Sequence, residues 1–106
     1  MRFFISKCFI FAFVIKNISL IISGKVQGVY FRQTARQKAE ELNISGTVRN
    51  MRDGNVMIEA EGEESALYEM YRWSQEGSPL SIVKEVKMEE GEVKNFKGFH
   101  ILKTDH

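Results

Sequence analysis

The stretch GKVQGVYFR, residues Gly24 to Arg32, joins a predicted strand to a predicted helix. In the preceding segment, Asn17 to Ser23, apolar side chains stand at every second position, which is typical of a strand with one buried face. After the stretch, small and apolar residues recur at spacings of four and three, as in an amphipathic helix: Ala35, Ala39 and Leu42. The chain is therefore predicted to run from a strand through a tight loop into a helix.

The loop between these elements is suited to bind an anion. The first N–H groups of a helix have no intrahelical partner, and the helix dipole places partial positive charge at the same point. Gly24 and Gly28 allow backbone conformations closed to other residues, so successive amides can turn toward one centre. The guanidinium of Arg32 adds a charged fork of donors. The amides predicted to bind phosphate belong to Gln27, Gly28, Val29, Tyr30, Phe31 and Arg32.

On spacing alone, a glycine-containing turn followed by a surface arginine remains an equal alternative. The loop does not have the nucleotide-binding sequence that ends in Gly-Lys-Ser/Thr, because Tyr30-Phe31-Arg32 stands there instead. ATP and Mg²⁺ are therefore not implied. Phe31 is expected to anchor the core and Tyr30 to border the site, and neither is expected to be catalytic.

A second segment, GTVRNMRDGNVMIEAEG from Gly46 to Gly62, predicts two strands joined at Arg52-Asp53-Gly54-Asn55. Asp-Gly between alternating segments is a strong hairpin signal. Asn50 lies near the end of the first of these strands. Taken by itself, such an asparagine is more often a polar residue beside a turn than a catalytic one.

Together, the two segments resemble the acylphosphatase family, whose pattern is GxVQGVxFR, a helix, and then GxVxNxxDGxV. Every fixed position is met, and the interval from Arg32 to Asn50 also matches. The resemblance continues through Glu61-Gly62 and SPLSIVKEV, Ser78 to Val86, and covers residues 15 to 104. Two linked motifs at the right separation are a far more specific signal than either motif alone.

The resemblance implies an activity and two catalytic residues. Arg32 matches the arginine that binds the phosphoryl group together with the loop amides, and Asn50 matches the asparagine that orients the attacking water. The implied reaction is hydrolysis of an acyl phosphate to a carboxylate and inorganic phosphate, without a metal ion or other cofactor. This agrees with the chemistry, because phosphoryl transfer requires mainly positioning and electrostatic stabilisation.

A non-catalytic module that binds phosphate or an acyl phosphate is the alternative, as in similar domains that serve larger carbamoyl-transfer proteins. The enzyme is favoured because the chain stands alone and has both Arg32 and Asn50. RNA binding on an open sheet face is a third possibility with little support, since the outward positions lack a basic and aromatic pair at strand spacing.

The remaining chain predicts a scaffold around this site. Glu63 to Glu76 has the pattern of a second helix, and further strands are expected at Val83 to Glu89 and Phe99 to Thr104. This order is that of the α+β ferredoxin-like βαββαβ sandwich, with an antiparallel sheet backed by two helices. The resemblance places the acylphosphatase-like domain at residues 16–106.

Composition limits the possible partners and the compartment. The chain has 106 residues, 43% of them hydrophobic, and a net charge of +1, so no overall basic field favours nucleic acid. The single cysteine, Cys8, cannot form an intrachain disulfide and is expected to be an inert apolar residue, which fits a reducing, cytoplasmic location. His100 and His106 have no partners at metal-ligand spacing within a stable segment.

The N-terminal segment Met1 to Ile15 (MRFFISKCFIFAFVI) is longer and more apolar than the short polar lead usual for the family. Three interpretations are open: an extra strand or apolar flap, an extension upstream of the authentic start, or a membrane-targeting signal. The apolar run is too short to span a bilayer, so membrane association is the least favoured. A monomer is expected, with weak self-association through residues 1–15 if their phenylalanines are exposed.

Overall fold

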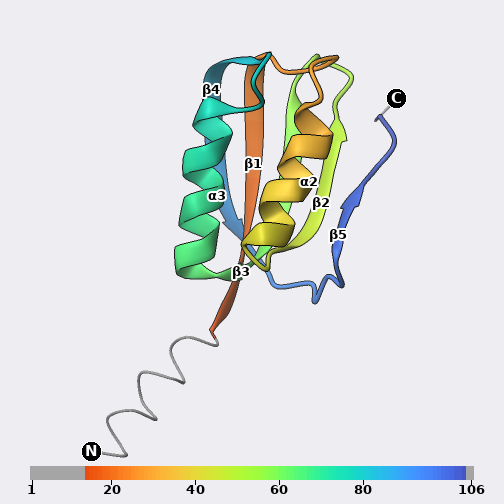
Figure 1. Cartoon of the computed structure of the whole chain (residues 1–106). Helices are drawn as coiled ribbons and strands as arrows, with labels where there is room; N and C mark the ends of the chain where they lie inside the picture. Colours follow the sequence, from red (N-terminus) through yellow and green to blue (C-terminus); the bar gives the residue numbers. More distant parts are fainter. Residues whose placement is uncertain (1–13, 105–106) are drawn as a thin grey trace, which may run out of the picture.

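A computed structural model describes residues 14–104 and contains one five-stranded sheet with two helices packed on one face (Figure 1). The predictions made for residues 1–13, including Cys8, and for His106 lie outside the described residues. The elements in chain order are β1 (Ile15–Lys25), α2 (Phe31–Glu41), β2 (Ser45–Asn50), β3 (Val56–Glu63), α3 (Glu64–Glu76), β4 (Ile82–Gly91) and β5 (Phe99–Ile101).

The strand order in the sheet is β4-β1-β3-β2-β5. The four longer strands pair antiparallel, so the predicted α+β ferredoxin-like fold is confirmed. The short β5 pairs parallel with β2, from Gly46 opposite Phe99 to Val48 opposite Ile101, and this makes the whole sheet mixed rather than antiparallel throughout. The chain after β4 must cross from one edge of the sheet to the other before it can reach β2, and it arrives running in the direction of β2.

The core lies between the sheet and the two helices. In β1, Ile18, Leu20 and Ile22 are buried, as their alternation predicted. The helices contribute one buried stripe each: Phe31, Ala35 and Ala39 from α2, and Leu67, Met70 and Ser74 from α3. In α2, the burial of Ala35 and Ala39 agrees with the face that the sequence predicted. Burying one large aliphatic side chain stabilises the fold by about 1.5–3 kcal/mol. The regular spacing of apolar residues in the strands and helices therefore accounts for the packing of the two helices on the sheet.

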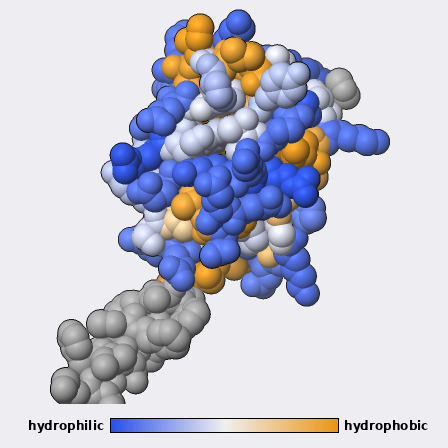
Figure 2. Space-filling model, viewed as in Figure 1, coloured by the Kyte–Doolittle hydropathy of each residue, from blue (hydrophilic) through white to orange (hydrophobic). Residues whose placement is uncertain are grey.

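The side of the molecule that faces the viewer in Figure 1 is mostly hydrophilic at its surface, while hydrophobic side chains gather at the upper end (Figure 2). Leu80, in the connection from α3 to β4, and Ile82, at the start of β4, are large hydrophobic residues that are exposed. Neither α2 nor α3 is long and apolar enough to cross a membrane, and they are the only helices in residues 14–104.

A glycine at the end of β1 fixes how the strand enters the loop. Gly24 has φ +124°, and the pairing of β1 with β4 shifts register between Ser23 and Gly24. A Cβ atom at Gly24 would collide with the backbone oxygen of Ile82. Only glycine therefore allows β4 to lie this close while the chain bends toward the loop.

On the sheet face opposite the helices, the carboxylate of Glu61 holds the segment that leads to β5. It accepts hydrogen bonds from the N–H of Lys94, from the N–H of Phe96 at 3.0 Å, and from Nδ2 of Asn17 at 2.9 Å. The Glu61 side chain is buried. Burial acts to raise its pKa, but the hydrogen bonds from Lys94, Asn17 and Phe96 outweigh burial and hold the pKa below its ordinary value.

We predict that Glu61 makes the fold sensitive to acid. Because its pKa is lower in the folded than in the unfolded protein, its contribution is fully present above the ordinary carboxyl pKa of about 4.3 and is lost as the pH falls through the folded value. Urea unfolding should show that Glu61→Gln is less stable than the wild type at pH 7 by about 1–3 kcal/mol. This difference should shrink at pH 3.

The matched control is Glu63→Gln, which removes an exposed carboxylate from the same strand. It should follow the wild-type stability at both pH values. A stability difference between wild type and Glu61→Gln that stays constant from pH 7 to pH 3 would contradict this role for the carboxylate.

Candidate active site

Strand topology brings the two sequence motifs together. Both β1 and β2 pair antiparallel with β3, which lies between them, so β1 and β2 run in the same direction and finish at the same end of the sheet. Neighbouring strands are about 4.8 Å apart, so the ends of β1 and β2 are separated by about 10 Å. The loop that follows β1 therefore lies beside Asn50, the last residue of β2.

A pocket of about 270 Å³ opens at this end of the sheet. It is lined by Val26, Gly28, Tyr30, Phe31, Arg32, Gln33 and Asn50. The structure thus brings Arg32 and Asn50, the two residues predicted to be catalytic, to one cavity. Four of the six loop residues predicted to bind phosphate through their amides also line it: Gly28, Tyr30, Phe31 and Arg32.

The loop backbone has a positive φ at two residues before the helix. Gly28 has φ +74°, and Tyr30, which caps the N-terminus of α2, has φ 61° and ψ 24°. For a residue with a side chain this conformation costs about 1 kcal/mol. The oxygen of Tyr30 accepts hydrogen bonds from both the N–H and the hydroxyl of Thr34, so the first turn of α2 closes on it.

The first intrahelical hydrogen bond of α2 is donated by the N–H of Thr34 to the oxygen of Tyr30. The N–H groups of Phe31, Arg32 and Gln33 come before that donor and therefore have no intrahelical partner. They lie at the positive end of the α2 dipole. All three residues line the pocket. The arrangement is that of an anion site at a helix N-terminus.

The side chain of Gln27 ties the loop to the β2–β3 turn. Its Nε2 donates to the oxygen of Met51 at 2.8 Å and to the oxygen of Asn55 at 2.9 Å. The turn itself is the predicted hairpin, with Gly54 at φ +95° and the N–H of Met51 bonded to the oxygen of Asn55. The Gln27 side chain therefore fixes the position of the loop relative to Met51, the residue that follows Asn50.

Asn50 and Arg32 are two of the polar residues that line the pocket. Asn50 is 8% exposed, and its Oδ1 is buried without a hydrogen-bond partner among the described residues. An unpartnered buried carbonyl oxygen costs about 1–3 kcal/mol, so this atom is available to accept a hydrogen bond from a water molecule. Arg32 is half-buried and makes no ion pair within residues 14–104, which leaves its fork to an anion.

Gln27 and Val29, of which the backbone amides were predicted to bind phosphate, are not among the residues that line the pocket. The side chains of Gln27 and Val29 point away from the pocket, since Gln27 reaches the hairpin turn and Val29 is buried in the core. Phe31 is a core anchor and Tyr30 is exposed at the border of the site, as predicted. The link made by the Gln27 side chain was missed, because no local pattern in the sequence signals a hydrogen bond to a turn so far along the chain.

Four further polar residues lie in or near the two motifs. Of these, Gln33 lines the pocket, and Lys25, Arg36 and Arg49 do not. The side chain of Arg49 lines a separate hollow, together with Glu59 and Lys94. Within residues 14–104 no group of three or more His, Cys, Asp or Glu side chains is placed to hold a metal ion. His100 is exposed and contacts the oxygen of Lys97.

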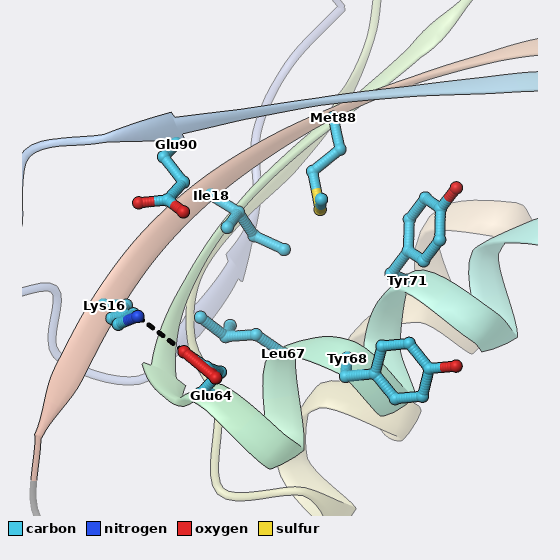
Figure 3. A pocket seen from close by; sticks show the side chains of 8 residues that line it. All are labelled: Lys16, Ile18, Glu64, Leu67, Tyr68, Tyr71, Met88 and Glu90. Atoms are coloured by element: carbon cyan, nitrogen blue, oxygen red, sulfur yellow. Dashed lines mark hydrogen bonds and ion pairs between the residues drawn. The ribbon is translucent and has the colours of Figure 1, made fainter.

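A larger and more apolar pocket, of about 360 Å³, lies between α3 and the strands β1 and β4 (Figure 3). Figure 3 shows Ile18, Leu67 and Met88 around it, with the ion pair of Lys16 and Glu64 at one end. None of the residues that define the two sequence motifs lines this pocket. Its size therefore does not make it the candidate active site.

The fold and the site define a class of protein: a small α+β domain with an anion-binding loop at a helix N-terminus and a polar amide beside it. Residues 18–101 match the family model for acylphosphatase. The chain belongs to the acylphosphatase family, and the resemblance seen in its two motifs is confirmed.

The chain is similar to a curated acylphosphatase of Rubrobacter xylanophilus, with 47% identity over 75 residues, 71% of this chain and 68% of the relative. A solved acylphosphatase from Coxiella burnetii superposes with a TM-score of 0.81 at 39% identity and covers 83% of this chain and 93% of its own. A structure of full-length HypF in its phosphate- and nucleotide-bound form gives a TM-score of 0.80 at 36% identity, over 87% of this chain but 12% of HypF.

We predict that inorganic phosphate stabilises the folded protein through Arg32. A ligand that binds only the folded state at a hundred times its dissociation constant adds about 2.7 kcal/mol to the free energy of unfolding. Thermal unfolding should therefore shift upward with phosphate. Most of that shift should be lost in Arg32→Ala.

The matched control is Arg36→Ala, which removes an exposed arginine one turn further along α2, outside the pocket. It should keep the full phosphate shift, and sodium chloride at equal ionic strength should produce none in either protein. An unchanged shift in Arg32→Ala would exclude this arginine from the anion site.

Proposed function

We propose that this protein is an acylphosphatase that hydrolyses the carboxyl–phosphate bond of small acyl phosphates with Arg32, the loop amides and Asn50. Membership of the family supports the activity. The observation that carries the residue assignment is that Arg32 and Asn50 line one pocket, with the Oδ1 of Asn50 lacking a hydrogen-bond partner among the described residues.

The phosphoryl group binds where the loop meets α2. Its oxygens accept from the N–H groups at the start of the helix and from the guanidinium of Arg32, which can form two parallel bonds. As the bond to the acyl oxygen breaks, negative charge spreads over the equatorial oxygens, and donors already aimed at them need no rearrangement. The protein thus contributes fixed positive charge and position.

Asn50 holds the attacking water. Its Oδ1 accepts a hydrogen bond from one O–H group of the water and so directs an oxygen lone pair toward phosphorus. As the bond from the water oxygen to phosphorus forms and the bond from phosphorus to the acyl oxygen breaks, the water's other proton passes to an oxygen of the substrate. A carboxylate is a good leaving group, so a strong protein base is not required. The products are a carboxylate and inorganic phosphate. The proposed reaction uses no metal ion or other cofactor.

The alternative, a module that binds phosphate without turnover, is the less favoured function. HypF shows that a domain of this fold can form part of a much longer chain. Here the resemblance to the curated acylphosphatases runs over most of the chain, and Arg32 and Asn50 are both present. We further propose a monomeric, cytoplasmic enzyme formed by residues 16–106, in keeping with a single cysteine and no overall basic charge.

The proposal predicts hydrolysis of benzoyl phosphate in the presence of EDTA, with no hydrolysis of a phosphate monoester. Arg32→Ala and Asn50→Ala should each lower kcat/KM by about 10²–10³, the usual cost of removing one donor or orienting group from such a site. Initial rates, measured alongside circular dichroism spectra to verify folding, provide the test.

The controls are Arg36→Ala and Asn55→Ala. The second removes a side-chain amide from the neighbouring turn, and within residues 14–104 this amide bonds only Asp53. Both should retain nearly full activity. A folded wild type that binds phosphate but never turns over benzoyl phosphate would refute the enzyme and leave the binding module.

A further inference from the structure

A buried serine far from the motifs touches the phosphate-binding loop. Ser78 follows α3 and is 2% exposed, and its hydroxyl donates to the oxygen of Val29 at 2.8 Å. Ser78 does not line the pocket. Ser78 therefore contacts the loop from the interior of the protein, on the side opposite the surface where an anion would bind.

This hydrogen bond orients the peptide unit between Val29 and Tyr30. The described chain has only trans peptide bonds, and in a trans peptide the C=O and the N–H point in opposite directions. Because Ser78 holds the Val29 oxygen toward the interior, the N–H of Tyr30 is turned toward the outside. Tyr30 lines the pocket, so its N–H is directed to the side on which the phosphoryl oxygens would lie.

The same bond helps to keep Tyr30 in its unfavourable conformation. A non-glycine residue stays left-handed only where its surroundings determine the peptide planes on both sides. Thr34 donates to the carbonyl oxygen of Tyr30, which belongs to the peptide unit after this residue. Ser78 donates to the carbonyl oxygen of Val29, which belongs to the peptide unit before it. Without Ser78, only the helix side of Tyr30 would remain fixed.

Ser78 is itself placed firmly. The backbone carbonyl oxygen of Ser78 accepts hydrogen bonds from the N–H of Ser81 at 3.0 Å and from the Ser81 hydroxyl at 2.7 Å, and these bonds close a turn. The N–H of Gly77 bonds to the oxygen of Trp73 at the end of α3, and the Trp73 ring lies 5.2 Å from that of Phe31. The end of α3 therefore forms a rigid support for the loop.

We propose that Ser78 is a positioning residue for acyl phosphate hydrolysis, which aims the loop amides at the phosphoryl group through the Val29 carbonyl. The inference rests on the proposed function and extends it to a residue outside both motifs. Ser78 does not touch the substrate. Its hydroxyl sets the direction of a donor that does.

The test compares Ser78→Ala with Ser74→Ala. Ser74 is an equally buried serine whose hydroxyl donates to the Met70 oxygen within α3, also at 2.8 Å, so its removal costs a similar hydrogen bond without touching the loop. Three quantities are measured for each variant and for the wild type: thermal stability, the dissociation constant of inorganic phosphate by calorimetry, and kcat and KM for benzoyl phosphate.

Both variants should lose similar stability. Ser78→Ala should also weaken phosphate binding and lower kcat, each by about tenfold or more, because a small misplacement of a binding group can cost up to about 10²-fold in rate. Ser74→Ala should leave both values as in the wild type. Ser78→Cys fills nearly the same space with a weak donor, so its phosphate affinity and kcat should lie between those of Ser78→Ala and the wild type. This variant replaces Ser78→Ala in the test if the alanine variant does not fold.

Equal phosphate affinity and equal kcat in the folded Ser78 variants and Ser74→Ala would overturn the inference and leave Ser78 a purely structural residue. The outcome is separable from that of the proposed function. If the wild type does not turn over benzoyl phosphate, the enzyme is refuted, and the phosphate dissociation constants alone still decide whether Ser78 aims the loop.

Discussion

The site depends on keeping the backbone between β1 and α2 in a conformation that it would not hold alone. Gly28 adopts a positive φ freely, but Tyr30 does so at a cost. Hydrogen bonds between the loop and the rest of the structure, from Gln27 to the β2–β3 turn and from Ser78 to Val29, fix it from two sides. A ring of amides is useful to an anion only if it is rigid before the anion arrives, since preorganised donors need no rearrangement during the reaction.

The sheet explains why the fold can offer such a site. Because β3 lies between β1 and β2, the two strands that carry the motifs finish side by side at one end. At the other end of β1, Asn17 and Glu61 form a polar anchor that binds the segment leading to β5. One end of the sheet thus holds the candidate chemistry, while the other secures the crossing that completes the sheet.

The comparison with HypF shows that this fold also occurs as a part of a much longer protein. A domain with a TM-score of 0.80 to this chain makes up 12% of that much longer protein. The fold alone therefore does not decide between hydrolysis and participation in a larger assembly. The assignment rests on the pocket that joins Arg32 to Asn50 and on the similarity to acylphosphatases over most of the chain.

The sequence by itself determined the order of elements, the buried faces and the two motifs, because these follow from local periodicity and from turn chemistry such as Asp53-Gly54. It also pointed to Arg32 and Asn50, through the resemblance of the motifs to a known family. It did not reveal that β5 pairs parallel with β2, since strand pairing depends on where a long crossing segment ends.

The tertiary structure alone placed Gln27, Ser78 and Glu61 in contact with backbone atoms far along the chain. A hydrogen bond between residues separated by tens of positions leaves no periodic trace in the sequence. Its existence is decided by packing, which brings the donor and the acceptor within reach only after the sheet and helices have assembled.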